Sequence, residues 1–283
     1  MMNEENTKTI LSVQDISCYG QCSNTVMLPV LSAAGLETVA LPTALLSTHT
    51  GGFHDFTFLD LTDEMEKILA HFKTLSLRFD YLCTGYFGSR AQIDLLLASL
   101  PAILAEGAVR VIDPVLGDNG KLYSIYDMEY VATMRRLCAG ADVITPNVTE
   151  ACLLADIPCP DTPRYDQEFL DRLFPCLQAL GVRRVLLTGV MFDDTTIGVV
   201  TCDENGKRTT VAAPYYDGYI HGTGDTLAAS FIGFLSQGKS FEEAARRAVD
   251  FVAGCLTDTI PVIDKHWYGL RFEKSLYKLT DRS

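Results

Sequence analysis

Residues 222–235 read GTGDTLAASFIGFL, and they join a glycine-rich turn directly to an apolar helical pattern. The two glycines remove side chains at positions where backbone N–H groups would approach a ligand. A helix that starts here adds unpaired N–H donors and a partial positive charge, which together suit an anion such as phosphate. Asp225 would lie beside that anion, where a carboxylate accepts a proton from an attacking hydroxyl. Helix capping by Thr223 or Asp225 is the alternative explanation.

Upstream of this stretch, short apolar runs rich in β-branched residues alternate with longer helical patterns. This alternation is typical of an α/β fold, with a mostly parallel central sheet and helices on both faces. The predicted strands are residues 10–14, 38–41, 81–84, 109–113, 143–145 and 185–188. Residues 196–202 and 208–213, joined by the turn sequence DENG, predict an antiparallel hairpin at one edge of the sheet.

The composition narrows the classes of function. Hydrophobic residues make up 48% of the 283 positions, which is enough to bury a substantial core. No repeat or linker divides the chain, so we expect a single domain over residues 1–283. The net charge of -13, without any basic run, argues against nucleic acid as a partner.

The cysteines and the termini bear on the cellular compartment. Nine cysteines are scattered along the chain without a CxxC pair, which predicts buried, reduced thiols and a cytoplasmic protein. The first residues, MMNEENTKT, are polar and acidic, and no segment has roughly 18 uninterrupted apolar residues. We therefore expect neither secretion nor a membrane span.

Polar residues follow most of the predicted strands. In open parallel sheets ligands bind beyond the carboxyl ends of the strands, so these residues should gather along one rim. They are Asp15, Gly85, Asp113, Asn147 and Thr188.

Two of these strand ends carry oxygen ligands. The sequence DPVLGD at residues 113–118 places two carboxylates beyond a strand, and TPNVTE at residues 145–150 adds an amide and a third carboxylate. Such oxygens suit Mg²⁺, which keeps several waters and shares the phosphates of a substrate. Simpler explanations exist, because the two aspartates fit turns, and Asn147 with Glu150 fits a helix capping box.

Taken together, the motifs resemble the ribokinase-like vitamin kinases, and within them the pyridoxal (vitamin B6) kinases. The resemblance covers nearly the whole chain. It rests on ordered matches at Val13-Gln14 with Tyr19-Gly20, STHTG at 47–51, TGY at 84–86, DPVLGD at 113–118, TPN at 145–147 with Glu150, Thr188 and GTGD at 222–225. It implies a Rossmann-type sandwich, usually a homodimer, that transfers the γ-phosphoryl group of ATP to the 5′-hydroxymethyl group of a pyridine ring. A Walker lysine motif is absent from the sequence, which excludes a P-loop enzyme.

The resemblance also implies a role for individual residues. Asp225 is the implied catalytic base, and the implied anion hole consists of the amides of Gly222, Thr223 and Gly224. The implied ATP neighbourhood is Asp113, Asn147, Glu150, Thr188 and Gly189. Asp118 and Glu150 resemble the family's Mg²⁺-associated acids, and a monovalent cation, K⁺ or Na⁺, is implied at Asp113, Thr145 and Thr188. Positioning and charge neutralisation supply most of the catalysis in such phosphoryl transfers.

The implied vitamer pocket consists of Asp15, His49, Thr50, Tyr86 and Tyr123. Position 15 departs from the family, whose members commonly have Ser there. A carboxylate at this position would pair with a protonated ring nitrogen or with the 4′-ammonium of pyridoxamine, since charge-assisted hydrogen bonds are stronger than neutral ones. Our hypothesis is a preference for pyridoxamine. The alternative is that Asp15 accepts hydrogen bonds from the backbone of a loop at residues 16–20.

Other interpretations of the pocket stay open. His49 fits a satisfied core histidine as well as a pocket wall, and residues 117–123 fit either a lid over the site or an ordinary surface loop. The aromatic run at residues 257–279 fits packing or an interface.

Other functions also stay open. A hydroxymethylpyrimidine kinase would share Asp225 and the anion hole, and a non-catalytic vitamer- or nucleotide-binding protein would keep the pocket. A sugar kinase fits less well, because its early glycine pair is not evident. A nicotinamide dehydrogenase also fits poorly, because the glycine fingerprint after the first strand is missing.

Overall fold

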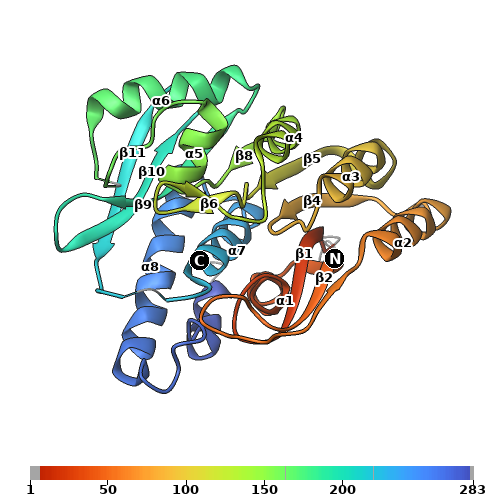
Figure 1. Ribbon diagram of the computed structural model, residues 1–283, viewed down its shortest axis with the longest axis horizontal. Coiled ribbons are helices and arrows are strands. Elements are labelled where there is room, and N and C mark those ends of the chain that lie inside the picture. The colour runs from red at the N-terminus through yellow and green to blue at the C-terminus, as the bar shows by residue number, and fades with distance from the viewer. Residues whose placement is uncertain (1–6, 163, 219, 281–283) are drawn as a thin grey trace, which may run out of the picture.

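The centre of the molecule is a nine-stranded sheet with the order β11-β10-β9-β8-β5-β4-β1-β2-β3 (Figure 1). The computed structural model describes residues 7–162, 164–218 and 220–280. All pairs between β9 and β2 are parallel, whereas β10, β11 and β3 run antiparallel to their neighbours. This arrangement confirms the predicted α/β fold class and the edge hairpin.

The strands of the main sheet include all those predicted, with some differences in length. Their bounds are β1 Thr9–Tyr19, β2 Glu37–Thr48, β3 Phe58–Asp60, β4 Phe79–Thr84, β5 Leu104–Ile112, β8 Val143–Ile144, β9 Arg184–Met191, β10 Thr196–Cys202 and β11 Arg208–Pro214. A separate two-stranded hairpin consists of β6 Gly117–Asp118 and β7 Lys121–Leu122.

Helices cover both faces of the sheet. One face carries α1 Asn24–Ala33, α7 Thr223–Ser236 and α8 Phe241–Thr259. The other carries α2 Thr62–Thr74, α3 Arg90–Ile103, α4 Met128–Cys138, α5 Val148–Ala155 and α6 Gln167–Ala179. The 3₁₀ helices η1 Ile260–Val262 and η2 Glu273–Leu279 follow α8. None of the helices in the described part of the chain combines the length and apolarity that a membrane span requires.

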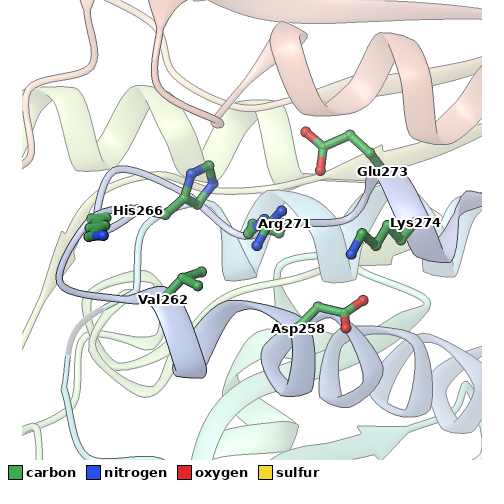
Figure 2. Close-up of a pocket in the computed structure, with 7 residues that line it drawn as sticks. Asp258, Val262, His266, Arg271, Glu273 and Lys274 are labelled. Atoms are coloured by element: carbon green, nitrogen blue, oxygen red, sulfur yellow. The ribbon is translucent and has the colours of Figure 1, made fainter.

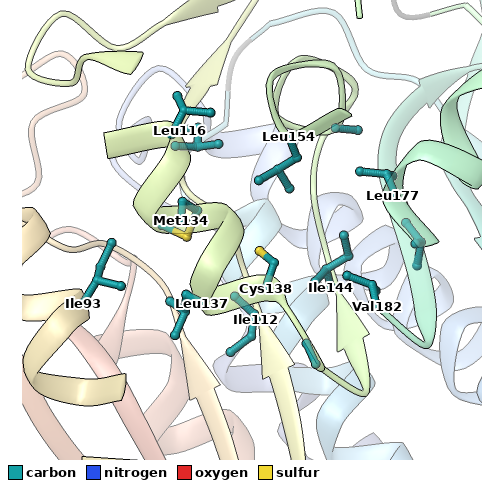
Figure 3. Packing of buried hydrophobic residues seen from close by; sticks show 14 of the residues in the cluster. Ile93, Ile112, Leu116, Met134, Leu137, Cys138, Ile144, Leu154, Leu177 and Val182 are labelled. Atoms are coloured by element: carbon teal, nitrogen blue, oxygen red, sulfur yellow. The ribbon is translucent and has the colours of Figure 1, made fainter. Parts of the chain in front are cut away.

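Each face of the sheet has its own hydrophobic core, because successive strand residues point to opposite faces. In β1, Leu11 belongs to the core under α2 to α6, and Ile10 belongs to the core under α1, α7 and α8. Figure 3 shows the first core, where Met134 and Leu137 of α4 pack beside Ile112 and Ile144 of the sheet. Burial on both faces explains why the central strands appear as continuous apolar runs in the sequence.

The N-terminal part of the sheet is longer than predicted. β1 continues past residue 14 and β2 past residue 41, and they stay paired as far as Tyr19 and Thr48. The short strand β3 then covers the far edge of β2. All three residues of β3 are exposed, so it lacks the apolar alternation by which a strand is recognised in a sequence.

Candidate active site

The ends of the central strands line up as the sequence predicts. Backbone hydrogen bonds connect this rim: Gly85 N donates to Val13 O at 3.0 Å, Asp113 N to Thr84 O at 3.3 Å, Thr145 N to Ile112 O at 3.0 Å and Thr188 N, inside β9, to Pro146 O at 2.8 Å. Asn147 also pairs with Thr188 as an isolated bridge. Four of the five predicted rim residues therefore lie side by side along one edge.

Asp15 lies inside β1, which continues as far as Tyr19. Residues 16–19 continue the strand beside β2, so the predicted loop at residues 16–20 is wrong. The Asp15 side chain is buried, and its Oδ2 accepts a hydrogen bond of 2.9 Å from the Ser17 hydroxyl. Burial raises the pKa of Asp15, and hydrogen bonds from Ser23 and Ser17 partly oppose that rise.

The first turn of α7 is where the sequence predicts an anion cradle, and we call residues 222–224 the cradle. Gly222 caps the helix with a φ of 77°, and its carbonyl accepts hydrogen bonds from Thr226 N at 2.9 Å and Thr226 Oγ1 at 2.7 Å. A Cβ at position 222 would lie 2.0 Å from the carbonyl oxygen of Gln21, so only glycine fits there. The amides of residues 223–225 have no acceptor within the helix, and a Cβ at Gly224 would meet nothing within 4 Å. The cradle is open on the side that an anion would approach.

Asp225 lies at this same turn and is half-buried. Burial raises the pKa of its carboxyl group to about 6, helped by the charge of Asp15, while the backbone amide of Ser23 opposes the rise. A general base works best when its pKa is close to the operating pH, because it then accepts a proton readily and is still mostly ionised. The electrostatics of Asp225 fit the role of base.

The beginning of α5 is a complete capping box, as its sequence predicts. Asn147 Oδ1 accepts from Glu150 N at 2.9 Å, and Glu150 Oε2 accepts from Asn147 N at 2.8 Å. Asn147 Nδ2 also donates to Gly117 O at 2.9 Å, and Glu150 Oε1 accepts from Leu116 N at 3.2 Å. These bonds tie α5 to the loop after β5 and hold the Glu150 carboxylate at the strand ends.

Two acids at these strand ends have raised pKa values. Burial raises the pKa of Glu150 to about 8, the charge of Asp118 adds to this, and the backbone amides of Asn147 and Leu116 oppose it. Burial also raises the pKa of Asp113, together with the charges of Glu150 and Asp225. A bound cation would lower the free energy of such a group of acids.

The carboxylate and hydroxyl oxygens at these strand ends fit a cation that is bound together with the phosphates of a substrate. They do not surround a metal ion completely. Within residues 7–162, 164–218 and 220–280, no three His, Cys, Asp or Glu side chains come together in a way that would hold an ion. Mg²⁺ in kinases needs only one or two carboxylates besides phosphates and waters. In the same described ranges the buried hydroxyls of Thr84 and Thr145 have no hydrogen-bond partner, so they are free to accept a cation or water. Thr188 Oγ1 contacts Pro146 O at 3.3 Å, and Gly189 adopts a φ of 70°.

Residues 117–123 form an ordered hairpin. β6 and β7 pair across Asn119 and Gly120, whose φ values of 51° and 74° suit a tight hairpin turn. Asp118 Oδ1 accepts from Asn119 N at 2.8 Å, which is the turn role predicted as its alternative. Tyr123 follows with 39% of its surface exposed and its ring 6.4 Å from that of Tyr126. Closure of this hairpin as a lid stays a prediction.

His49 is a buried residue with both ring nitrogens engaged. Gly51 N donates to Nδ1 at 3.1 Å, so the ring proton is on Nε2, which donates to Tyr268 O at 2.8 Å. The histidine thus fastens the loop after β2 to the segment between η1 and η2. The next residue, Thr50, is exposed.

Tyr86, the other predicted pocket wall, lies beside Asp15. Burial raises the pKa of Tyr86 to about 12, and the charges of Asp15 and Asp60 add to the rise. Its carbonyl accepts a hydrogen bond from Thr43 Oγ1 at 2.8 Å. The charge of Asp15 therefore acts on Tyr86, and a pocket shared by the two stays a prediction.

Several residues around this site were not predicted from the sequence. The His49 ring lies 4.5 Å from that of His221, which directly precedes the cradle, and 4.9 Å from that of Phe53. Phe53 lies 4.6 Å from Trp267. We call His49, Phe53, His221, Trp267 and Tyr268 the aromatic enclosure. Burial, helped by the charge of His49, lowers the pKa of His221 to about 4, so this ring is neutral near pH 7.

An open amide cradle with a carboxylate of raised pKa beside it, facing strand-end acids, suits transfer of a phosphoryl group to a hydroxyl. The fold and this site thus define an α/β phosphotransferase. The model of the phosphomethylpyrimidine kinase family matches residues 28–268, and the chain belongs to that family.

Solved structures agree over almost the whole chain. A Bacteroides thetaiotaomicron protein provisionally named a phosphomethylpyrimidine kinase is 38% identical, with a TM-score of 0.92 over 99% of this chain and 96% of that one, and another crystal form of it contains pyridoxal. Pyridoxal kinase from Lactobacillus plantarum is 36% identical, with a TM-score of 0.88 over 96% of both chains. Pyridoxal kinase from Leishmania donovani, in complex with ADP and pyridoxamine, is 25% identical with a TM-score of 0.85 over 97% of this chain and 96% of that one.

Proposed function

We propose that this chain is an ATP-dependent kinase that phosphorylates the 5′-hydroxymethyl group of a vitamin B6 vitamer, in the salvage of pyridoxal 5′-phosphate. The observation that carries the proposal is the open amide cradle at residues 222–224 with Asp225 beside it. The pyridoxal kinases among the solved structures support the vitamer as acceptor, and ADP in one of them supports ATP as the phosphoryl donor.

In this reaction Asp225 accepts the proton of the vitamer hydroxyl as its oxygen attacks the γ-phosphorus of ATP. The new O–P bond forms while the bond to the β-phosphate oxygen breaks, and ADP leaves. The amides of residues 222–224 face the transferring group and stabilise its charge, since preorganised donors need no rearrangement during the reaction. The chain supplies position and charge, and ATP supplies the reactive bond.

Cations complete the proposed site. Mg²⁺ bound with ATP would be held by Asp118 and Glu150, and it would neutralise charge on the phosphates. K⁺ or Na⁺ would be held near Asp113, Thr145 and Thr188, where the unpartnered hydroxyl of Thr145 supports such a ligand. Asn147, Thr188 and Gly189 would border the ATP phosphates.

The vitamer ring would lie between Asp15, Tyr86 and the aromatic enclosure, with Thr50 and Tyr123 at its borders. The pairing of Asp15 with Tyr86 supports this placement. A carboxylate at position 15 would hold a protonated amine or ring nitrogen, which is why we propose a preference for pyridoxamine.

We further propose a single kinase domain over residues 1–283, assembled as a homodimer in the cytoplasm. All nine cysteines are free thiols, which supports a reducing compartment. The net charge of -13 supports small molecules, and not nucleic acid, as partners.

A direct test is ADP release from Mg-ATP with pyridoxal, pyridoxine, pyridoxamine and hydroxymethylpyrimidine offered separately. A reaction without acceptor is the control, and mass spectrometry identifies the phosphorylated product. We expect turnover with the B6 vitamers. Turnover with the pyrimidine alone would show a hydroxymethylpyrimidine kinase, and no turnover with any acceptor would favour a non-catalytic binding protein.

A further inference from the structure

A cavity lies between the end of α8 and the two 3₁₀ helices (Figure 2). Its volume is about 550 Å³, which falls within the range of small-molecule sites. The residues that line it are mostly charged: Asp258, Val262, Lys265, His266, Arg271, Glu273 and Lys274. Neither the proposed reaction nor the similarity to known kinases gives this cavity a role.

Three cations, Lys265, Arg271 and Lys274, line the cavity together with two carboxylates, Asp258 and Glu273. Among residues 7–162, 164–218 and 220–280, the ion pairs within 4.0 Å use none of Lys265, Arg271 and Lys274. Figure 2 shows Arg271 between His266 and Lys274, with its guanidinium group beside the open space. In a chain with a net charge of -13, a wall with three cations and two carboxylates carries a local positive excess.

The two acids of the cavity wall come from different elements, Asp258 from α8 and Glu273 from η2. Glu273 is engaged elsewhere, because its Oε1 accepts a hydrogen bond from Gln21 Nε2. Asp258 belongs to α8, on the opposite wall from Glu273 in Figure 2. It has no ion pair within 4.0 Å in the described ranges.

Gln21 helps to hold the wall in place. Gln21 Oε1 lies 3.2 Å from His266 Nε2, its Nε2 donates to Glu273, and its backbone N–H donates to Tyr268 O at 3.2 Å. Gln21 also pairs with Gly269 as an isolated bridge. These bonds fix the segment that carries the cations before any ligand arrives, and preorganisation of this kind favours binding.

We propose that this cavity is a binding site for a small phosphate-bearing molecule, distinct from the active site. The planar fork of Arg271 binds two oxygens of one phosphate, and Lys265 and Lys274 add positive charge on either side. The remaining volume accommodates an organic part, whose hydroxyl or ammonium group would face Asp258. Phosphate is the shared chemistry, and its source is either a free ion or a phosphate monoester.

The test is isothermal titration of the full chain with inorganic phosphate and, separately, with pyridoxine 5′-phosphate, which has no aldehyde to react with lysines. We expect wild-type protein to bind at least one of them. Lys274→Gln and Arg271→Lys should each weaken that affinity by roughly tenfold, as expected for loss of one charge-assisted bond. Lys278→Gln is the matched control, because it removes an exposed charge from the same helix outside the cavity and should bind as wild type.

Lys274 is exposed, so its substitution leaves packing intact and keeps the test independent of folding. Tighter binding of pyridoxine 5′-phosphate than of phosphate would identify a monoester as the ligand, and equal binding would identify the free ion. Absence of binding by either anion would overturn the proposal. Equal affinities of wild type, Lys274→Gln and Arg271→Lys would overturn it too, because the anion would then be bound elsewhere, for example at the cradle.

Discussion

The cradle at the start of α7 and the aromatic enclosure meet at His221 and Gly222, yet they are built in opposite ways. The cradle consists of consecutive residues, and most of its work is done by backbone amides. The enclosure joins the loop after β2 to the segment after α8, and its central hydrogen bond links His49 to Tyr268, 219 positions away. In the proposed reaction these are two separate tasks, because the phosphoryl group would depend on the local geometry of the cradle and the fit of the ring on tertiary packing.

The largest effect should come from Asp225→Ala. Loss of a general base should lower kcat by about 10²–10⁴-fold, and the KM for ATP should stay nearly unchanged because the cradle and strand ends remain. Steady-state kinetics with Mg-ATP and the preferred vitamer would measure this. A variant with near-normal kcat would remove Asp225 from the mechanism and leave the cradle as a binding element only.

The cradle itself is tested by Gly222→Ala. The new Cβ would lie 2.0 Å from Gln21 O at a φ of 77°, so the backbone must move. The amides of the cradle would then no longer point at the transferred phosphoryl group. Loss of an oxyanion-hole donor costs about 10²-fold in kcat. Gly224→Ala is the matched control for folding, because its Cβ meets nothing within 4 Å. Equal melting temperatures of the two variants would contradict the described contact.

The pH dependence of kcat/KM tests the role of Asp225 without a mutation. The raised pKa of Asp225, about 6, means that the base is mostly ionised at pH 7 and becomes protonated as the pH falls. We expect kcat/KM to level off above about pH 7 and to fall by about tenfold per pH unit well below pH 6. This acidic limb should disappear from the residual activity of Asp225→Ala. A profile that stays flat down to pH 5 would show that burial does not raise this pKa.

In the enclosure, Trp267→Ala should act on binding alone. Its ring lies 4.6 Å from Phe53, and an aromatic pair is worth about 0.5–1.5 kcal/mol, so the vitamer KM should rise by roughly two- to tenfold. The kcat should not change, because the cradle is untouched. Tyr277→Ala, at an exposed position of η2, is the control. A fall in kcat without a change in KM would show that the enclosure positions the cradle and not the ring.

The smallest effect should come from Asp15→Ser. Replacing a charge-assisted bond by a neutral one costs about 1 kcal/mol, which corresponds to roughly fivefold in kcat/KM. We expect this loss for pyridoxamine relative to pyridoxal. Asp15→Asn keeps the shape and removes the charge, so it should show the same shift. An unchanged preference in both variants would show that Asp15 serves β1 and Ser17 only.

The sequence was sufficient for the features that depend on local chemistry. The capping box of Asn147 and Glu150, the rim of strand ends and the edge hairpin were all predicted, because turn residues and periodicity specify them within a few positions. The extension of β1 was not predicted. Residues 16–19 are strand because β2 runs beside them, and the run from Ser17 to Gly20 resembles a turn when it is considered alone.

The aromatic enclosure could not be predicted for a related reason. Phe53 and Trp267 are ordinary aromatic residues in segments that no spacing connects. Only their close packing, 4.6 Å apart, shows that they belong to one site. Gly52 is a weak indication of this packing, because a Cβ there would lie 2.9 Å from the Trp267 ring. The missing side chain can be interpreted only once the contact with Trp267 is known.

The division into two cores has a consequence for how the chain folds during synthesis. Ile10, Tyr81 and Val111 line the sheet face that α7 and α8 cover, and residues 223–259 leave the ribosome long after them. At 5–20 residues per second, the delay between residue 112 and α7 is roughly ten seconds. Through that interval α1 is the sole early helix on this apolar face. The nascent chain therefore exposes a partly covered apolar sheet face to chaperones until α7 and α8 have been synthesised.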